Sequence, residues 1–179
     1  MKKLIASLAF AIAVTSLQAQ TYTASDDRSE IKFSIKNFGL TVNGSFKGLK
    51  GKINFNPANT TTASFNASVP VATINTGNGS RDNHLKKEEY FDASKFPVIN
   101  FVLTRISKST KAGTLQMEGK ITIKGVTKVV SFPFTATPKM EGFLFAGSFK
   151  LNRRDFGVGG KSLVLSDTLT VELAVFANK

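Results

Sequence analysis

The chain has 179 residues, with 24 lysines and arginines, 12 acidic residues, one histidine and no cysteine. Without cysteine, a domain of this size must be held together by its hydrophobic core, and attachment as a lipoprotein through an N-terminal cysteine is excluded. The formal charge of +12 would attract anionic lipid head groups, phosphates or nucleic acid. Nucleic acid is disfavoured, because the lysines are spread singly rather than gathered into arginine-rich clusters beside stacking aromatics.

The first 19 residues predict a secretory signal peptide. Two lysines precede an apolar run from Leu4 to Val14, which is too short to span a bilayer, and Ala19 stands at the expected cleavage site. We expect cleavage after Ala19 and export to the periplasm. Residues 20–179 would then form one mature domain, whose formal charge is +10 once the two lysines are removed.

The mature sequence predicts strand after strand. In residues 30–36, Ile31, Phe33 and Ile35 alternate with polar residues, which is the pattern of a sheet with one dry face and one wet face. The same alternation recurs at 52–56, 63–71, 99–103, 115–123, 130–134, 143–151 and 169–175. An antiparallel meander of about eight strands should close into a barrel or fold as a sandwich, because closure removes exposed edges.

One region interrupts this pattern. From Asp82, the expected N-cap, residues up to Glu89 favour a helix, and Pro97 ends the region. We expect a short helical insertion around residues 82–96 that covers one end of the barrel.

The aromatic composition indicates which way the apolar faces point. An outer-membrane barrel needs girdles of tryptophan and tyrosine, but the chain has no tryptophan and only Tyr22 and Tyr90. The barrel is therefore expected to be soluble, with an apolar interior. The 16 phenylalanines would give that interior large apolar side chains without hydrogen-bonding groups, which suits a long hydrocarbon. Alternatively, the rings pack against one another and fill the barrel.

Several short motifs follow one another along the mature chain. They are Ser29-x-Ile31-x-Phe33, Gly44-x-Phe46, Gly51-x-Ile53, Thr76-Gly77-Asn78, Arg81-Asp82-x-His84-Leu85, Phe91-Asp92, Phe96-Pro97-x-Ile99-x-Phe101, Gly119-x-Ile121-Thr122-Ile123-Lys124-Gly125, Arg154-x-Phe156-Gly157-Val158 and Ser166-Asp167. Together they resemble the YceI-like family of exported isoprenoid-lipid-binding proteins.

The resemblance implies an all-β fold, an eight-stranded antiparallel lipocalin-like barrel with a long apolar tunnel. The tunnel would hold an isoprenoid quinone or a polyprenyl phosphate, which the protein carries or sequesters, and the family suggests a homodimer. With inward positions taken from the alternation, the expected lining is Phe33, Phe46, Phe55, Phe65, Ile99, Phe101, Phe132, Phe134, Phe149 and Phe156.

Four polar residues are candidates for contact with the ligand at the mouth of the tunnel. Arg81, Asp82 and His84 lie within four residues, and Arg154 comes later in the chain. A guanidinium donates directed hydrogen bonds to a phosphate or a quinone carbonyl, and a histidine can donate to the same oxygen. Alternatively, Arg81 and Asp82 form an ion pair and a helix cap, and His84 is a partly buried structural residue.

Catalysis is not expected, because the chain offers one histidine, no cysteine and no Gly-x-Ser-x-Gly nucleophile elbow. A metal site is not expected either, because His84 with Asp82 or Glu88 falls short of the ligands that zinc takes. We expect no cofactor besides the bound lipid. Two other hypotheses are a ligand-free, non-catalytic barrel that associates with anionic envelope components through its basic surface, and an isoprenoid-modifying enzyme that uses Arg81 and His84.

Overall fold

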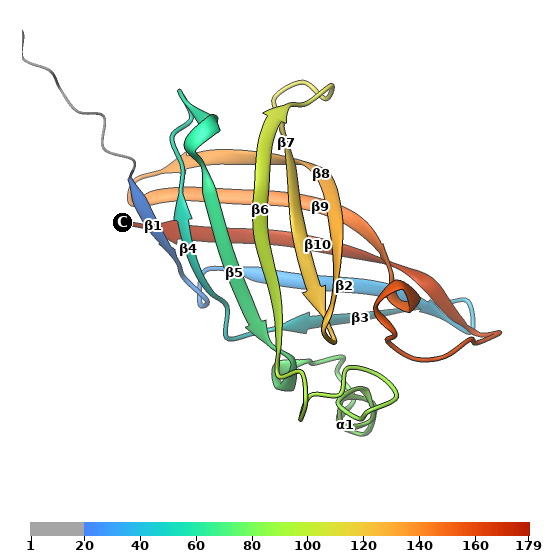
Figure 1. The fold of residues 1–179 in the computed structure, drawn as a ribbon. Helices are drawn as coiled ribbons and strands as arrows, with labels where there is room; N and C mark the ends of the chain where they lie inside the picture. Colours follow the sequence, from blue (N-terminus) through green and yellow to red (C-terminus); the bar gives the residue numbers. More distant parts are fainter. Residues whose placement is uncertain (1–19) are drawn as a thin grey trace, which may run out of the picture.

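A computed structural model describes residues 20–179 (Figure 1), and the predicted signal peptide lies outside this range. Ten strand segments form one antiparallel sheet that closes on itself. They are β1 (Thr21–Ala24), β2 (Glu30–Asn37), β3 (Leu40–Phe46), β4 (Lys50–Asn54), β5 (Ser64–Pro70), β6 (Val98–Lys108), β7 (Leu115–Ile123), β8 (Val126–Lys139), β9 (Gly142–Asn152) and β10 (Leu165–Asn178). Within residues 20–179, no helix is long and apolar enough to cross a membrane.

The ten segments make an eight-stranded barrel, as predicted, because two strands of the wall are each interrupted once. β1 and β2 follow one another along the same edge of β10, where Ala24 pairs with Ala177 and Ile31 pairs with Leu173. β4 and β3 pair in turn with β1 and β2. From β4 the sheet continues in chain order through β5 to β10, and the pairing of β10 with β1 closes it.

The two interruptions lie side by side and are joined by polar contacts. The carboxylate of Asp26 accepts a hydrogen bond from the backbone N–H of Leu49 at 2.7 Å. The buried hydroxyl of Ser29 donates to the carbonyl of Ser25 at 2.6 Å and accepts from the N–H of Phe176 at 3.0 Å. These contacts satisfy backbone groups that the broken ladder leaves unpaired.

β1 and the C terminus lie at the same end of the barrel (Figure 1). An aromatic cluster fills this end. The ring of Phe145 lies 5.2 Å from that of Phe55 and 5.0 Å from that of Phe65, both edge to face. Phe143 closes the cluster, 5.4 Å from Tyr22. We call these five residues the aromatic cluster, and their packing provides a core that needs no ligand.

The insertion contains one helix, α1 (Gly79–Leu85), besides the short 3₁₀ segments η1 (Thr60–Thr62), η2 (Val71–Thr73) and η3 (Arg153–Phe156) elsewhere in the chain. The helix begins four residues before the predicted start, and the prediction of Asp82 as N-cap is wrong. The side chain of Asn78 caps the helix by accepting from the N–H of Arg81 at 3.0 Å. Asp82 instead accepts from the N–H and hydroxyl of Thr76 at 2.9 and 2.6 Å.

The residues after α1 are fastened to the barrel rather than free. The N–H of Gly159 donates to the carbonyl of Glu89 at 2.9 Å. The ammonium group of Lys124, in the turn between β7 and β8, donates to the carbonyls of Glu88 and Gly157 at 2.6 and 2.9 Å. The insertion and the η3 loop therefore form one cover over the same end of the barrel (Figure 1).

The Asp26 contact predicts a pH-dependent contribution to stability. Burial raises the pKa of Asp26, but hydrogen bonds from the backbone of Leu49 and Gly48 and the nearby charge of Lys47 outweigh it and hold the pKa below its usual value. A lowered pKa in the folded state means that the carboxylate stabilises the protein above about pH 4, and that this contribution is lost as the pH falls through the lowered pKa.

Asp26→Ala is expected to reduce the free energy of unfolding by about 1 kcal/mol near neutral pH and by less at about pH 3. Urea unfolding at both pH values measures this difference. The control is Asp27→Ala, which changes the neighbouring exposed carboxylate. If Asp26→Ala lowers the free energy of unfolding equally at both pH values, the stabilising role assigned to the Asp26 carboxylate is wrong.

Candidate functional site

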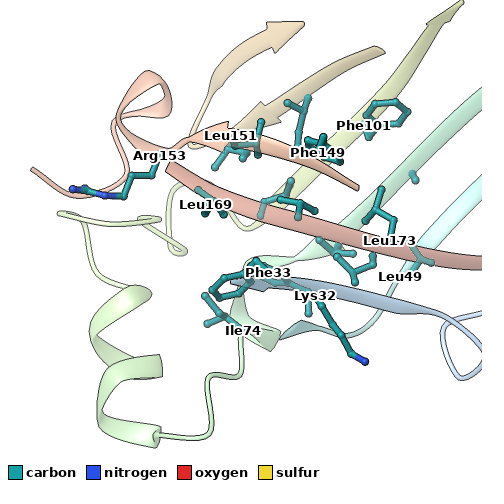
Figure 2. Close-up of a pocket in the computed structure, with 18 of the residues that line it drawn as sticks. Lys32, Phe33, Leu49, Ile74, Phe101, Phe149, Leu151, Arg153, Leu169 and Leu173 are labelled. Carbon is teal, nitrogen blue, oxygen red and sulfur yellow. The ribbon is translucent and has the colours of Figure 1, made fainter. Parts of the chain in front are cut away.

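A cavity of about 410 Å³ extends from the aromatic cluster toward the end covered by the insertion. On β10 its lining runs from Leu165 to Val175, a stretch that measures about 30 Å at the usual rise per residue of a strand. Figure 2 shows side chains from β2, β9 and β10 arranged around this space. The cavity is therefore long and narrow, and we call it the tunnel.

Glycines on neighbouring strands keep two phenylalanine rings against the wall of the tunnel. A β-carbon at Gly119 would lie 2.3 Å from Cζ of Phe101, and one at Gly44 would lie 2.2 Å from Cζ of Phe33. Each ring thus rests directly on a neighbouring backbone. Because these rings lie along the wall, they leave the lumen open. Rings also stack along the wall, as Phe132 does on Phe149 at 4.5 Å, but the phenylalanines fill the barrel at the aromatic cluster and not along its whole length.

Eight of the ten predicted apolar residues border the tunnel: Phe33, Phe46, Phe65, Ile99, Phe101, Phe132, Phe134 and Phe149. Phe55 and Phe156 do not. Phe55 is 2% exposed within the aromatic cluster. Phe156 is buried in η3, which contacts β8 and β10 and packs into the hydrophobic core. The eight residues are in position to touch a ligand, and that contact stays a prediction.

Two of the predicted polar residues, Arg81 and His84, border the tunnel from α1. They are three residues apart and so share one face of the helix. Nε and Nη2 of Arg81 donate to the hydroxyl and carbonyl of Thr76 at 2.7 and 2.8 Å. The half-exposed imidazole of His84 lies 3.6 Å from the carboxylate of Glu89. These side chains place hydrogen-bond donors at one end of a predominantly apolar tunnel.

Asp82 does not border the tunnel. Its carboxylate holds Thr76, so the predicted ion pair with Arg81 is replaced by a shared contact of both residues with that threonine. Asp82 is therefore placed to fix the start of the insertion.

The arginine that borders the tunnel at the end of β9 is the residue before the predicted one. Arg154 is exposed, lies outside the tunnel and pairs with Asp167 at 3.5 Å. Its neighbour Arg153 is 5% exposed and borders the tunnel (Figure 2). The alternation of β9 could have identified it, because Arg153 continues the inward series through Phe149 and Leu151.

The guanidinium of Arg153 has all five of its N–H groups engaged. Its acceptors are the carbonyls of Ser166 at 2.9 Å, Val158 at 2.9 Å, Gly160 at 3.0 Å and Leu165 at 3.4 Å, and the carboxylate of Asp167 at 2.8 Å. Arg153 therefore fastens the loop between η3 and β10 and has no donor left for a ligand.

The tunnel combines apolar surface along its length with donors at one end. Among residues 20–179, no three histidine, cysteine or acidic side chains converge on a possible metal position. This arrangement suits the binding of a molecule that has a long apolar body and a polar head.

Comparisons with known proteins agree with this geometry. The YceI-like domain model matches residues 22–177. The UPF0312 protein of Pseudomonas savastanoi pv. phaseolicola is 30% identical over 186 residues, which cover 97% of this chain and 96% of that protein. The UPF0312 protein of Pseudomonas fluorescens is 31% identical over 173 residues, which cover 88% of this chain and 87% of that protein.

Two solved structures share the fold. BcnA from Burkholderia cenocepacia has a TM-score of 0.81 at 22% identity, covering 87% of this chain and 99% of BcnA. A polyisoprenoid binding domain from Saccharophagus degradans, implicated in plant cell wall breakdown, has a TM-score of 0.68 at 13% identity. The match covers 88% of this chain and 97% of that domain.

The contacts of Arg153 predict a large difference between two adjacent arginines. Arg153→Lys is expected to lower the free energy of unfolding by about 3 kcal/mol, because an ammonium cannot reproduce the planar set of donors and several buried carbonyls lose their partners. Arg154→Lys should change it by less than about 0.5 kcal/mol. Denaturant unfolding of the two variants measures this, and equal stabilities would contradict the role assigned to Arg153.

Proposed function

The chain belongs to the YceI-like family, and we propose that its barrel binds one isoprenoid-type amphiphile, such as an isoprenoid quinone or a polyprenyl phosphate. In this proposal the protein acts without catalysis, as a carrier or sequestering protein in the periplasm. The observation that carries it is the apolar tunnel of about 410 Å³, which runs along most of β10. The name of the Saccharophagus degradans domain, which has the same fold and is called polyisoprenoid binding, supports it.

Burial of the tail would supply the affinity. Ten methylene groups taken out of water contribute roughly 8 kcal/mol, before the cost of immobilising the ligand. Micromolar or tighter binding is then within reach of the tunnel without a covalent or metal contact.

The head group would lie at the α1 end. Nη1 of Arg81 makes no hydrogen bond within residues 20–179, and His84 borders the tunnel beside it. These donors suit an oxygen of a phosphate or a quinone. The tail would extend toward Phe65 and Phe145, where the aromatic cluster begins.

Mass spectrometry of an organic-solvent extract tests the proposal directly. The mature protein, purified from its own envelope without detergent, should release an isoprenoid in a stoichiometric amount, and a matched exported protein should not. Protein that is repeatedly empty and also fails to take up added quinones or prenyl phosphates would contradict the proposal and favour the ligand-free barrel.

A pair of tryptophan variants tests whether the tunnel itself is the binding site. Phe101 points into the tunnel, and its neighbour Val102 is 47% exposed on the outer face. Phe101→Trp should weaken binding by tenfold or more, because the larger ring cannot lie flat on Gly119 and must enter the lumen. Val102→Trp should bind as the unchanged protein does. Titration of both variants with a quinone measures this, and equal affinities would place the ligand elsewhere.

A further inference from the structure

Four exposed apolar residues gather at the end of the barrel opposite the C terminus. Phe38 and Leu40, in the β2–β3 hairpin, are each 73% exposed. Leu163 and Val164, in the loop before β10, are 100% and 38% exposed. The N–H of Phe38 donates to the carbonyl of Val164 at 2.9 Å and joins the two loops. Figure 1 shows both loops projecting together from this end, and we call the four residues the apolar tip.

Neither backbone preference nor core packing accounts for Phe38. It has a φ of 49° and precedes Gly39 with a φ of 74°, a left-handed pair at which hairpin turns favour asparagine and glycine. Lys124 has the same φ of 49° in another hairpin, but its ammonium fastens the insertion to the η3 loop. The ring of Phe38 is largely in solvent, so its position calls for a contact outside this chain.

The second loop of the tip is held in its exposed position. Arg153 bonds to the carbonyls of Gly160 and Leu165, on either side of Leu163. The hydroxyl of Ser162 accepts from the N–H groups of Val164 and Leu165 at 3.2 and 3.0 Å. Presenting Leu163 to a partner therefore requires little ordering of the loop.

The tip is flanked by positive charge. Lys36 and Lys161 are exposed beside it, and the stretches 36–41 and 160–165 contain no acidic residue. The tip is also continuous with the tunnel, because Asn37 pairs with Leu165 and both border the tunnel next to Phe38 and Val164.

We propose that the apolar tip inserts into the surface of an anionic lipid bilayer and holds the mouth of the tunnel against it. Four residues are too few for a stable protein interface, which takes about 20–30 residues on each side, but they suit shallow insertion beside lysines that meet anionic head groups. The contact with lipid stands on the tip itself. The further step, in which cargo passes between the bilayer and the tunnel at this point, rests on the proposed function.

A single introduced tryptophan reports the contact, because the chain has none of its own. In Phe38→Trp, emission should shift to the blue on vesicles of phosphatidylethanolamine and phosphatidylglycerol, and brominated lipid chains should quench it. The control is Met140→Trp, at a fully exposed position next to the C terminus, whose emission should not change. An unchanged spectrum for Phe38→Trp would overturn the proposal.

Phe38→Asn separates membrane contact from folding. Asparagine suits the left-handed turn, so the variant should be at least as stable as the unchanged protein in a thermal melt. Its affinity for the same vesicles should fall roughly tenfold, whereas that of Met140→Ser should not change. Added salt should weaken the binding of the unchanged protein. If Phe38→Asn instead halves the mass measured by light scattering and leaves vesicle binding intact, the tip joins two copies of the chain and the proposal is wrong.

Uptake measurements distinguish this proposal from the one on which it builds. The Phe38→Asn variant should take up a quinone dispersed in ethanol as well as the unchanged protein does, and take it up from vesicles more slowly. If the unchanged protein binds vesicles through Phe38 but takes up no quinone by either route, membrane contact stands and the proposed cargo is wrong. If uptake from vesicles is the same in both proteins, the tip is not the point of entry.

Discussion

The barrel depends on one strand, β10, both of whose edges are paired. One edge pairs with β9 from Thr168 to Asn178, and the other pairs with β2 and then with β1. Because backbone hydrogen bonds close the wall on both sides, the inward residues of β10 need no partner across the lumen. A sandwich of the same strands would collapse until its two faces touched. Closure through β10 is what allows Val171 and Leu173 to face a tunnel instead of a packed core.

The packed core and the tunnel occupy different parts of the axis of this barrel. At the end near the C terminus, Tyr22 and its phenylalanine neighbours bury their surface against one another. Toward the insertion, lining residues such as Phe33 and Leu169 are only partly buried by the chain itself, and the wall there is held by strand pairing and by the contacts of Arg153. A substitution in the tunnel can therefore change the shape of the tunnel while the core remains intact, provided that it respects the close approach of Phe101 to Gly119.

Local pattern predicted most of the barrel, and it failed where distant residues decide the outcome. The alternation predicted the inward face of nearly every strand and, extended by one step beyond Leu151, would have predicted Arg153 rather than Arg154. It missed β3, because Gly44 interrupts the alternation of Leu40, Val42 and Phe46 with polar residues, and the strand is held by pairing with β2. It chose Asp82 over Asn78 as the helix cap because both residue types cap helices, and only the position of Thr76 decides between them.

Phe55 and Phe65 were indistinguishable in sequence, since depth along the barrel depends on the register of several strands.

The aromatic cluster closes one end of the tunnel, so in the proposed function a ligand would be exchanged through the end at the insertion. With its head group at α1, a long molecule would then enter tail first and leave head first, past the donors of that helix. An incoming molecule could not push the resident one out at the closed end. Replacement would therefore pass through an unloaded protein, and its rate would be set by departure of the first molecule, whatever the concentration of the competitor. The same arrangement would present the polar end of the ligand outward, so an acceptor would meet the head group before any of the tail is exposed.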